Sequence, residues 1–137
     1  MPEKTFQLEV ITPDRVVLSD DQIVSVVAPG SEGYLGMLAN HAPLMTELVI
    51  GKLDFRRSDG TTGAMAISGG FLEVFENKVS VLAESAELAE EIDVDRAEQS
   101  KRRAEERLAS PASDTDVERA QAALHRAVNR LHIARPS

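Results

Sequence analysis

The sequence of 137 residues contains no cysteine and no tryptophan. Without a thiol, the chain cannot form a disulfide, ligate a metal through sulfur or attack a substrate with a thiolate. This composition is compatible with a reducing compartment. Hydrophobic residues make up 42% of the chain, which is enough for one modest core with an appendage.

Long apolar runs and an excess of basic residues are also missing. No apolar run approaches the roughly 20 residues that a membrane-spanning helix needs, and residues 1–4 do not have the pattern of a secretory signal. We therefore expect a soluble protein that meets a membrane only through a partner. The formal net charge of -8 argues against a nucleic-acid partner, because binding to phosphates requires a basic surface.

The first 85 residues are rich in valine and isoleucine and are punctuated by glycine. Turn signals recur every 8–12 residues or so, which favours an antiparallel sandwich or barrel over βαβ units. We interpret Gly69-Gly70 as a bend between two strands, because it lacks the glycine spacing and the following helix of a phosphate-binding loop. The expected strands are 6–10, 16–18, 23–27, 44–50, 52–56, 64–67, 71–75 and 78–82, with a loop at 29–33 and an Asp-Gly hairpin turn at 58–60.

The last third is rich in alanine, glutamate and arginine and has almost no aromatic residues. Strong helix formers predict one helix over 89–109 and a second that ends near residue 133. Asp93 is a candidate N-cap or first-turn acid for the first helix, and Asp114 or Thr115 for the second. The predicted fold class is therefore α+β: an N-terminal antiparallel β-sandwich (1–86) followed by a C-terminal antiparallel two-helix hairpin (87–137).

Each predicted helix has a narrow apolar stripe that is rich in alanine. Alanine allows close approach but buries little, about 0.8 kcal/mol for each CH₂-sized increment. We therefore expect a hairpin that is marginally stable alone and easy to open. The stripes are Ala97, Ala104 and Leu108 on the first helix, and Val117, Ala120, Leu124, Val128 and Leu131 on the second.

The string 92–97 (IDVDRA) bears most on function. Asp93, Arg96 and Arg103 lie within about 80° of one another on a helix, so they share a face. Arg126 and Arg130 lie about 150° and 110° from the centre of the second stripe, so helical spacing alone does not aim them at a ligand. Without a ligand, Asp93 and Arg96 are an ordinary i,i+3 ion pair worth about 0.2–0.5 kcal/mol, with solvated arginines beside it.

Seven strings, in order along nearly the whole chain, together resemble the epsilon subunit of the F-type ATP synthase. Each is weak alone, but the ordered set is specific. The family fold, a β-sandwich followed by a helical hairpin, agrees with the prediction from the residues. The strings are 10–14 (VITPD), 33–38 (GYLGML), 40–44 (NHAPL), 68–74 (SGGFLEV), 83–86 (AESA), 92–97 (IDVDRA) and 126–131 (RAVNRL).

The resemblance implies a regulatory subunit of the rotor's central stalk, with no active site of its own. Its sandwich would bind the gamma subunit and the c-ring and help to couple rotation to proton or sodium flow. Its helices, when extended, would contact the alpha and beta catalytic subunits and inhibit ATP hydrolysis. For a bacterial member, the implied location is the cytoplasmic face of the plasma membrane, as a peripheral protein.

The resemblance also implies site residues. The family motif Ile/Leu-Asp-x-x-Arg-Ala matches 92–97, and ATP, with or without Mg²⁺, would be a regulatory ligand rather than a catalytic cofactor. Guanidinium groups suit phosphate oxygens, whereas Glu87 and Asp93 suit adenine or ribose. The implied ATP-binding residues are Glu87, Ile92, Asp93, Arg96, Ala97, Arg103, Arg126 and Arg130.

For the partner interface, the resemblance points to Tyr34 and His41. Two positions depart from the family pattern: Ala39 replaces a usual proline, and Tyr34 stands where many members have an acid that faces the ring. Taken alone, His41 is more typical of a structural hydrogen-bonding histidine than of a ligand.

Two alternatives remain open. One is a purely structural stalk subunit that neither switches nor senses ATP. The other is a small ATP-hydrolysing enzyme, which ATP turnover by the purified chain would reveal. No Ser/His/Asp constellation supports the enzyme, and His41, His125 and His132 are too scattered to suggest a metal site.

Overall fold

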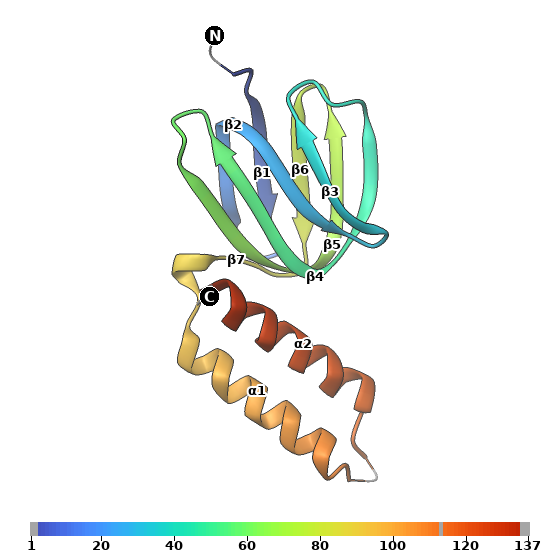
Figure 1. The fold of residues 1–137 in the computed structure, drawn as a ribbon. Coiled ribbons are helices and arrows are strands. Elements are labelled where there is room, and N and C mark those ends of the chain that lie inside the picture. The colour runs from blue at the N-terminus through green and yellow to red at the C-terminus, as the bar shows by residue number, and fades with distance from the viewer. Residues whose placement is uncertain (1–2, 113, 135–137) are drawn as a thin grey trace. The chain divides into compact units, whose positions relative to one another are not determined.

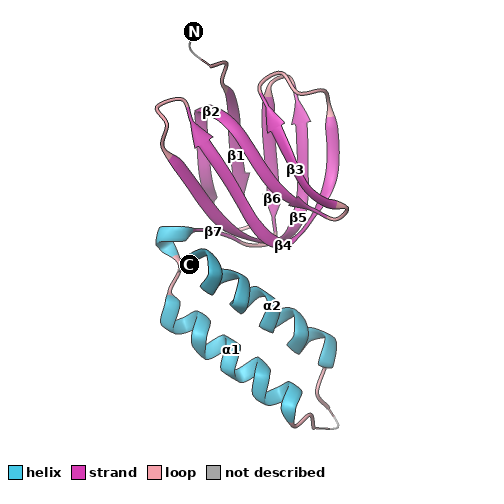
Figure 2. Ribbon diagram, viewed as in Figure 1, coloured by secondary structure: helices cyan, strands magenta, loops and turns pink. Residues whose placement is uncertain are grey.

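A computed structural model describes residues 3–112 and 114–134. The chain forms two compact units, Met1–Leu88 and Ala89–Ser137. The division lies two residues beyond the boundary at 86/87 that composition indicates. Strands make up the first unit and helices the second (Figure 1, Figure 2). In the part of the chain that the structure describes, no helix is both long and apolar enough to cross a membrane.

The first unit is a seven-stranded sheet that closes on itself. The strand order is β1-β6-β5-β4-β2-β3, β1 also pairs with β2, and β7 pairs with β5. All pairs are antiparallel except β1 with β6, which is parallel. The strands are β1 (Phe6–Ile11), β2 (Val16–Gly30), β3 (Gly33–Leu38), β4 (Leu44–Arg57), β5 (Thr62–Phe75), β6 (Lys78–Ala83) and β7 (Ala86–Leu88).

The core lies inside this closed sheet. Along β1 the burial alternates strictly, with Phe6, Leu8 and Val10 buried, as the period of two predicts. Full burial of each large aliphatic side chain contributes about 1.5–3 kcal/mol. Other fully buried side chains come from β2, β3, β4, β5 and β6: Ile23, Val26, Met37, Leu53, Met65, Ile67, Leu72, Val79 and Val81.

Several expected strand ends are wrong, because pairs of strands that were expected to be separate form single long strands. Gly51 lies inside β4, and Gly69-Gly70 lies inside β5. The two strands pair from Leu44 opposite Val74 to Arg56 opposite Thr62, interrupted only between Val49 and Gly69. Gly69 and Gly70 have φ values of 79° and 125°, which glycine adopts readily. The chain therefore bends at these glycines without leaving the sheet.

The second unit contains a 3₁₀ turn, η1 (Ala89–Glu91), followed by α1 (Val94–Ala109) and α2 (Val117–Ala134). The two helices are antiparallel neighbours (Figure 1). Together with the sheet, they confirm the predicted fold class. The expected α-helix start at residue 89 is wrong: the 3₁₀ turn ends at Glu91, and α1 begins after Asp93. Asp93 caps α1, its Oδ1 accepting the Arg96 backbone N–H at 3.0 Å.

The cap of α2 also differs from the prediction. Asp116 supplies it, its Oδ1 accepting the Arg119 backbone N–H at 3.0 Å. Thr115, one of the expected caps, closes the connector instead: its Oγ1 accepts the Ala112 N–H at 2.9 Å. The Thr115 hydroxyl is therefore engaged within the connector, and the next residue caps the helix. The expected stop at Arg135-Pro136 lies outside the described residues.

The hairpin seam is formed by alanine, as expected, but it is centred differently on α2. The buried helix residues include Ala97 and Ala104 on α1, and Ala120 and Ala127 on α2. Val117, expected in the stripe, is 43% exposed. Because alanines form the closest contact between the helices, α2 is rotated so that Ala127 faces α1. The larger Leu124, Val128 and Leu131 lie at the margins of the seam and are half-buried.

We predict that Gly70→Ala destabilises the sandwich far more than Gly60→Ala. A Cβ at position 70 would lie 2.1 Å from the Leu82 carbonyl oxygen, whereas one at Gly60 would have no heavy atom within 4 Å. Both have positive φ, so both variants carry backbone strain of about 1–3 kcal/mol. Only Gly70→Ala adds overpacking, about 1–3 kcal/mol more. Urea unfolding measures the difference, and equal losses would contradict the prediction.

Candidate functional site

The N-terminal part of α1 holds the motif 92–97. Ile92 and Ala97 are buried, so their contribution is to shape and packing. Asp93 uses Oδ1 to cap the helix. A carboxylate has about four acceptor positions, so Asp93 retains capacity for a further donor. The motif is thus a helix start whose cap is polar and whose apolar members are fixed by packing.

The arginines of the predicted site come from both helices. Arg96 and Arg103 are exposed on α1, and Arg126 and Arg130 are half-buried on α2. Arg103 Nη2 donates to Ser100 Oγ at 3.3 Å. Arg103 and Arg126 lie near the middle of their helices, whereas Arg96 and Arg130 lie nearer the open end of the hairpin.

These arginines lie on one side of the hairpin. At about 100° per residue, all four are displaced in the same rotational sense from the alanine seam, by about 70–110°. Relative to α1, the antiparallel helix α2 runs in the opposite direction, and its seam faces the opposite way. These two reversals cancel, so residues displaced in the same rotational sense from the seam lie on the same side of the hairpin. The observed seam, centred on Ala127, turns Arg126 and Arg130 closer to α1 than the predicted stripe did.

Glu87 is placed differently from the other predicted ATP-site residues. It lies in β7 and pairs with Ala66 of β5, so it belongs to the first unit rather than to the helical one. The helical unit contains all the other members of the predicted set. What it brings together is an arginine-lined face beside the carboxylate of Asp93, an arrangement suited to a polyphosphate.

Tyr34 lies on β3 with its side chain 62% exposed. Its hydroxyl oxygen accepts the backbone N–H of Lys52, on β4, at 3.3 Å. The pairing of β2 with β4 is irregular between Val27 and Gly30. A Cβ on Gly51 would lie 3.0 Å from the Tyr34 hydroxyl, so glycine permits this approach. The hydroxyl therefore has a structural role, while the ring remains accessible.

His41 lies in the loop between β3 and β4. The ring is half-buried, and Nδ1 lies 2.7 Å from the Ala42 carbonyl oxygen, so that nitrogen donates. The preceding residue, Asn40, has φ of 62°, and its N–H donates to Asn77 Oδ1 at 2.8 Å. The histidine thus forms a local structural hydrogen bond within a loop that is tied to the rest of the sandwich.

Sequence reasoning missed an exposed apolar surface on β4, β5 and β6. Its large side chains, each more than half exposed, are Met45, Phe71, Phe75 and Leu82; we call these four the β4–β6 face. Phe71 lies directly opposite Leu82. The signal was available: adjacent apolar residues such as Phe71-Leu72 and Val81-Leu82 make both sides of a strand apolar.

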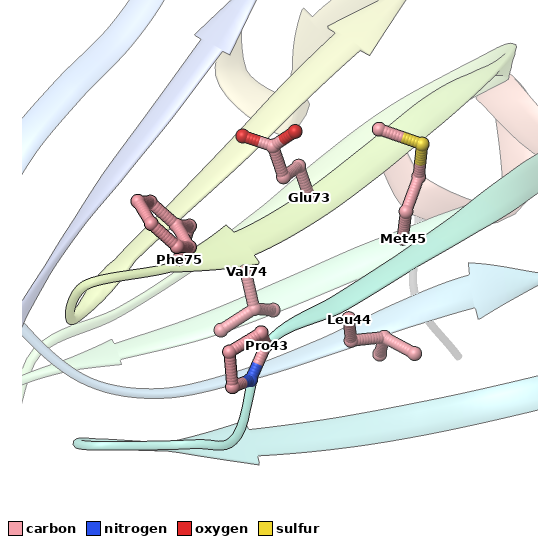
Figure 3. A pocket seen from close by; sticks show the side chains of 6 residues that line it. All are labelled: Pro43, Leu44, Met45, Glu73, Val74 and Phe75. Atoms are coloured by element: carbon pink, nitrogen blue, oxygen red, sulfur yellow. The ribbon is translucent and has the colours of Figure 1, made fainter.

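A hollow opens at one end of this face (Figure 3). The loop after His41 supplies Pro43, and the end of β5 supplies Val74 and Phe75, with the Glu73 carboxylate beside them. The complete lining is Pro43, Leu44, Met45, Glu73, Val74 and Phe75. The hollow is thus mainly apolar with a single acid.

Two ion pairs with shifted pKa values lie elsewhere in the sandwich. Burial raises the pKa of Asp20, but the hydrogen bonds from Arg57 (2.8 Å) and the Gln22 backbone outweigh burial and lower it overall. The bidentate hydrogen bonds from Arg56 lower the pKa of the exposed Glu3 carboxyl. Both carboxylates are held ionised by structural partners.

Family models match both units. The beta-sandwich domain of the ATP synthase delta/epsilon chain matches residues 5–89, and the long alpha-helix domain of the same chain matches residues 90–135. The chain belongs to the ATP synthase delta/epsilon family. This confirms the resemblance drawn from the sequence.

Relatives of this family member are similar over most of their length. An ATP synthase epsilon chain of Desulforamulus reducens is 49% identical over 131 residues, covering 96% of this chain and 98% of the relative. One from Pelotomaculum thermopropionicum is 56% identical over 109 residues, 80% of each. A chain in the Euglena gracilis mitochondrial ATP synthase structure shares the fold, with a TM-score of 0.77 at 24% identity, covering 91% of this chain and 78% of that one.

In this delta/epsilon chain, we predict that Tyr34→Phe loosens the contact of β3 with β4. The variant keeps the exposed ring but removes the acceptor for the Lys52 N–H, so unfolding free energy should fall by about 0.5–1.5 kcal/mol. Hydrogen exchange of the Lys52 amide should accelerate more than that of amides in β1 and β6, which serve as the internal control. Unchanged protection of Lys52 would contradict the structural role of the hydroxyl.

Proposed function

We propose that this chain is a central-stalk rotor subunit of an F-type ATP synthase. It would couple rotation to ion flow and inhibit ATP hydrolysis through its C-terminal helices, with ATP bound to the folded hairpin as the regulatory signal. Family membership and the epsilon-chain relatives support the stalk role. The observation that carries the ATP signal is the set of arginines from both helices on one side of an alanine seam.

ATP suits this side of the hairpin chemically. Guanidinium forks pair with phosphate oxygens, and charge-assisted hydrogen bonds are about twice as strong as neutral ones. In this proposal Arg96, Arg103, Arg126 and Arg130 hold the phosphates, with or without Mg²⁺, while Asp93 accepts a hydrogen bond from adenine or ribose. ATP is an effector here and is not hydrolysed.

The alanine seam makes the hairpin responsive to such a ligand. Buried alanines contribute little apolar area, so the folded hairpin has only a small advantage over an opened form. A ligand at about tenfold its Kd adds about 1.4 kcal/mol, which shifts only an equilibrium that is already near balance. When ATP falls, the helices would open, reach the alpha and beta catalytic subunits and block hydrolysis.

The sandwich would provide the permanent attachment. Tyr34, the His41 loop and the β4–β6 face are the surfaces that we assign to the gamma subunit and the c-ring. This assignment is supported by the large apolar side chains exposed on these surfaces, because such exposure marks interaction sites on soluble proteins. Through these partners the chain would lie at the cytoplasmic face of the bacterial plasma membrane, as a peripheral component.

We predict that the isolated chain binds ATP one-to-one and that Arg103→Ala and Arg126→Ala each weaken binding. Loss of one charge-assisted phosphate contact should raise Kd by about ten- to a hundredfold. Arg102→Ala is the matched control: Arg102 neighbours Arg103 but pairs with Glu98 on the opposite side of α1 (3.9 Å). Calorimetry, with and without Mg²⁺, measures all four chains.

The outcomes separate the competing functions. Absence of binding at millimolar ATP would favour a structural stalk subunit that does not sense ATP. Equal weakening in all three variants would indicate non-specific charge attraction rather than a site. Phosphate release that survives repeated purification, and that Arg103→Ala abolishes, would indicate a hydrolase.

We predict that holding the hairpin closed relieves inhibition in the assembled complex. Because the chain has no native cysteine, an engineered cysteine pair across the alanine seam would form a defined disulfide. ATP hydrolysis by the complex should rise when the disulfide forms and fall when it is reduced. The reduced protein is its own control, and unchanged inhibition in the oxidised state would contradict the switch.

A further inference from the structure

Asn77 joins three segments of the sandwich that are far apart in sequence. Its Oδ1 accepts the Asn40 backbone N–H at 2.8 Å, and its Nδ2 donates to the Thr5 carbonyl oxygen at 3.0 Å. Its own carbonyl oxygen accepts the Gln7 N–H at 3.3 Å. One side chain thereby links the start of β1, the β3–β4 loop and the β5–β6 turn.

The turn itself does not require an asparagine amide. Glu76 and Asn77 have φ values of 47° and 60°, and they connect Phe75 to its partner Lys78. Positive φ at both central residues is the requirement of a type I′ hairpin turn, which glycine meets at least as well as asparagine. The specific contribution of Asn77 therefore lies in what its side chain holds.

The segment held by Oδ1 is the loop that carries His41. Asn40 lies near the start of this loop, and Pro43, its last residue, lines the hollow. Phe75, two residues before Asn77, lines the same hollow (Figure 3). The hydrogen bond from Asn40 to Asn77 thus joins the two chain segments that supply Pro43 and Phe75.

We propose that Asn77 is a positioning residue for partner docking, which holds residues 39–43 in the conformation that the partner recognises. This rests on the proposed function, in which the His41 loop and the β4–β6 face belong to the surfaces that bind the gamma subunit and the c-ring; the docking proposed for Asn77 is to the gamma subunit. A loop that is ordered before binding avoids the entropic cost of ordering during association. Asn77 contacts the loop backbone and acts through it rather than through contact with the partner.

Two substitutions separate this role from simple support of the fold. Asn77→Gly keeps the positive-φ turn and removes both side-chain hydrogen bonds. Asn77→Asp keeps an oxygen to accept the Asn40 N–H and tolerates positive φ. It replaces the donor to Thr5 by a carboxylate oxygen, so the contact with the Thr5 carbonyl oxygen is lost and becomes repulsive. If loop positioning is what matters, Asp should rescue what Gly loses.

The experiment uses the full-length chain with two readouts. The first is hydrogen exchange at the Asn40 amide in the free chain. The second is the Kd for an ATP synthase subassembly that contains the gamma subunit but is depleted of this chain. Asn77→Gly should speed Asn40 exchange and raise Kd by about two- to tenfold, while Asn77→Asp stays close to wild type in both. Urea unfolding is recorded for each variant.

Three results would overturn the positioning role. Asn77→Gly could lose Asn40 protection yet bind normally, both variants could weaken binding equally, or Kd could follow unfolding free energy across the variants. A wild-type chain that does not bind the subassembly would instead refute the proposed function, and the positioning role would fall with it. The wild-type measurement therefore distinguishes the two failures.

Discussion

Strand β1 pairs along both of its edges, antiparallel to β2 and parallel to β6, and this double pairing closes the sheet. The strand has only six residues, yet closure depends on it. Once the sheet is closed, every strand residue faces either one shared core or the outside. The outward-facing residues of β4, β5 and β6 are then not needed for the core, so they can contact a partner without weakening core packing.

The helical unit is built on the opposite principle. Its seam is alanine, so the helices approach closely while burying little apolar area. The sandwich is thus the more stably packed unit and the hairpin an element of low stability, the kind from which moving parts are drawn. The division after Leu88 separates these two kinds of stability, as the proposed switch would require.

The sequence was sufficient for the fold class and the helix pairing, because strand alternation and helix composition act locally. It was insufficient where pairing between distant segments decided the outcome. Gly51 and Gly69-Gly70 look like strand ends, yet β4 and β5 run through them because twelve facing residue pairs hold the two strands together. The cap of α2 was misplaced by two residues or fewer, because Thr115 had a competing use in the connector.

For the candidate site, the sequence named candidate residues, and their arrangement came only from the structure. The predicted α2 stripe weighted large apolar residues, whereas close packing selected Ala120 and Ala127, and that rotation turns Arg126 and Arg130 toward the side of α1 that carries Arg96 and Arg103. The consequence is thermodynamic. A ligand held by one helix alone would bind the open and closed hairpins equally and shift nothing. A ligand held by arginines from both helices loses half of its contacts when the hairpin opens, so its binding energy acts directly on the closed state.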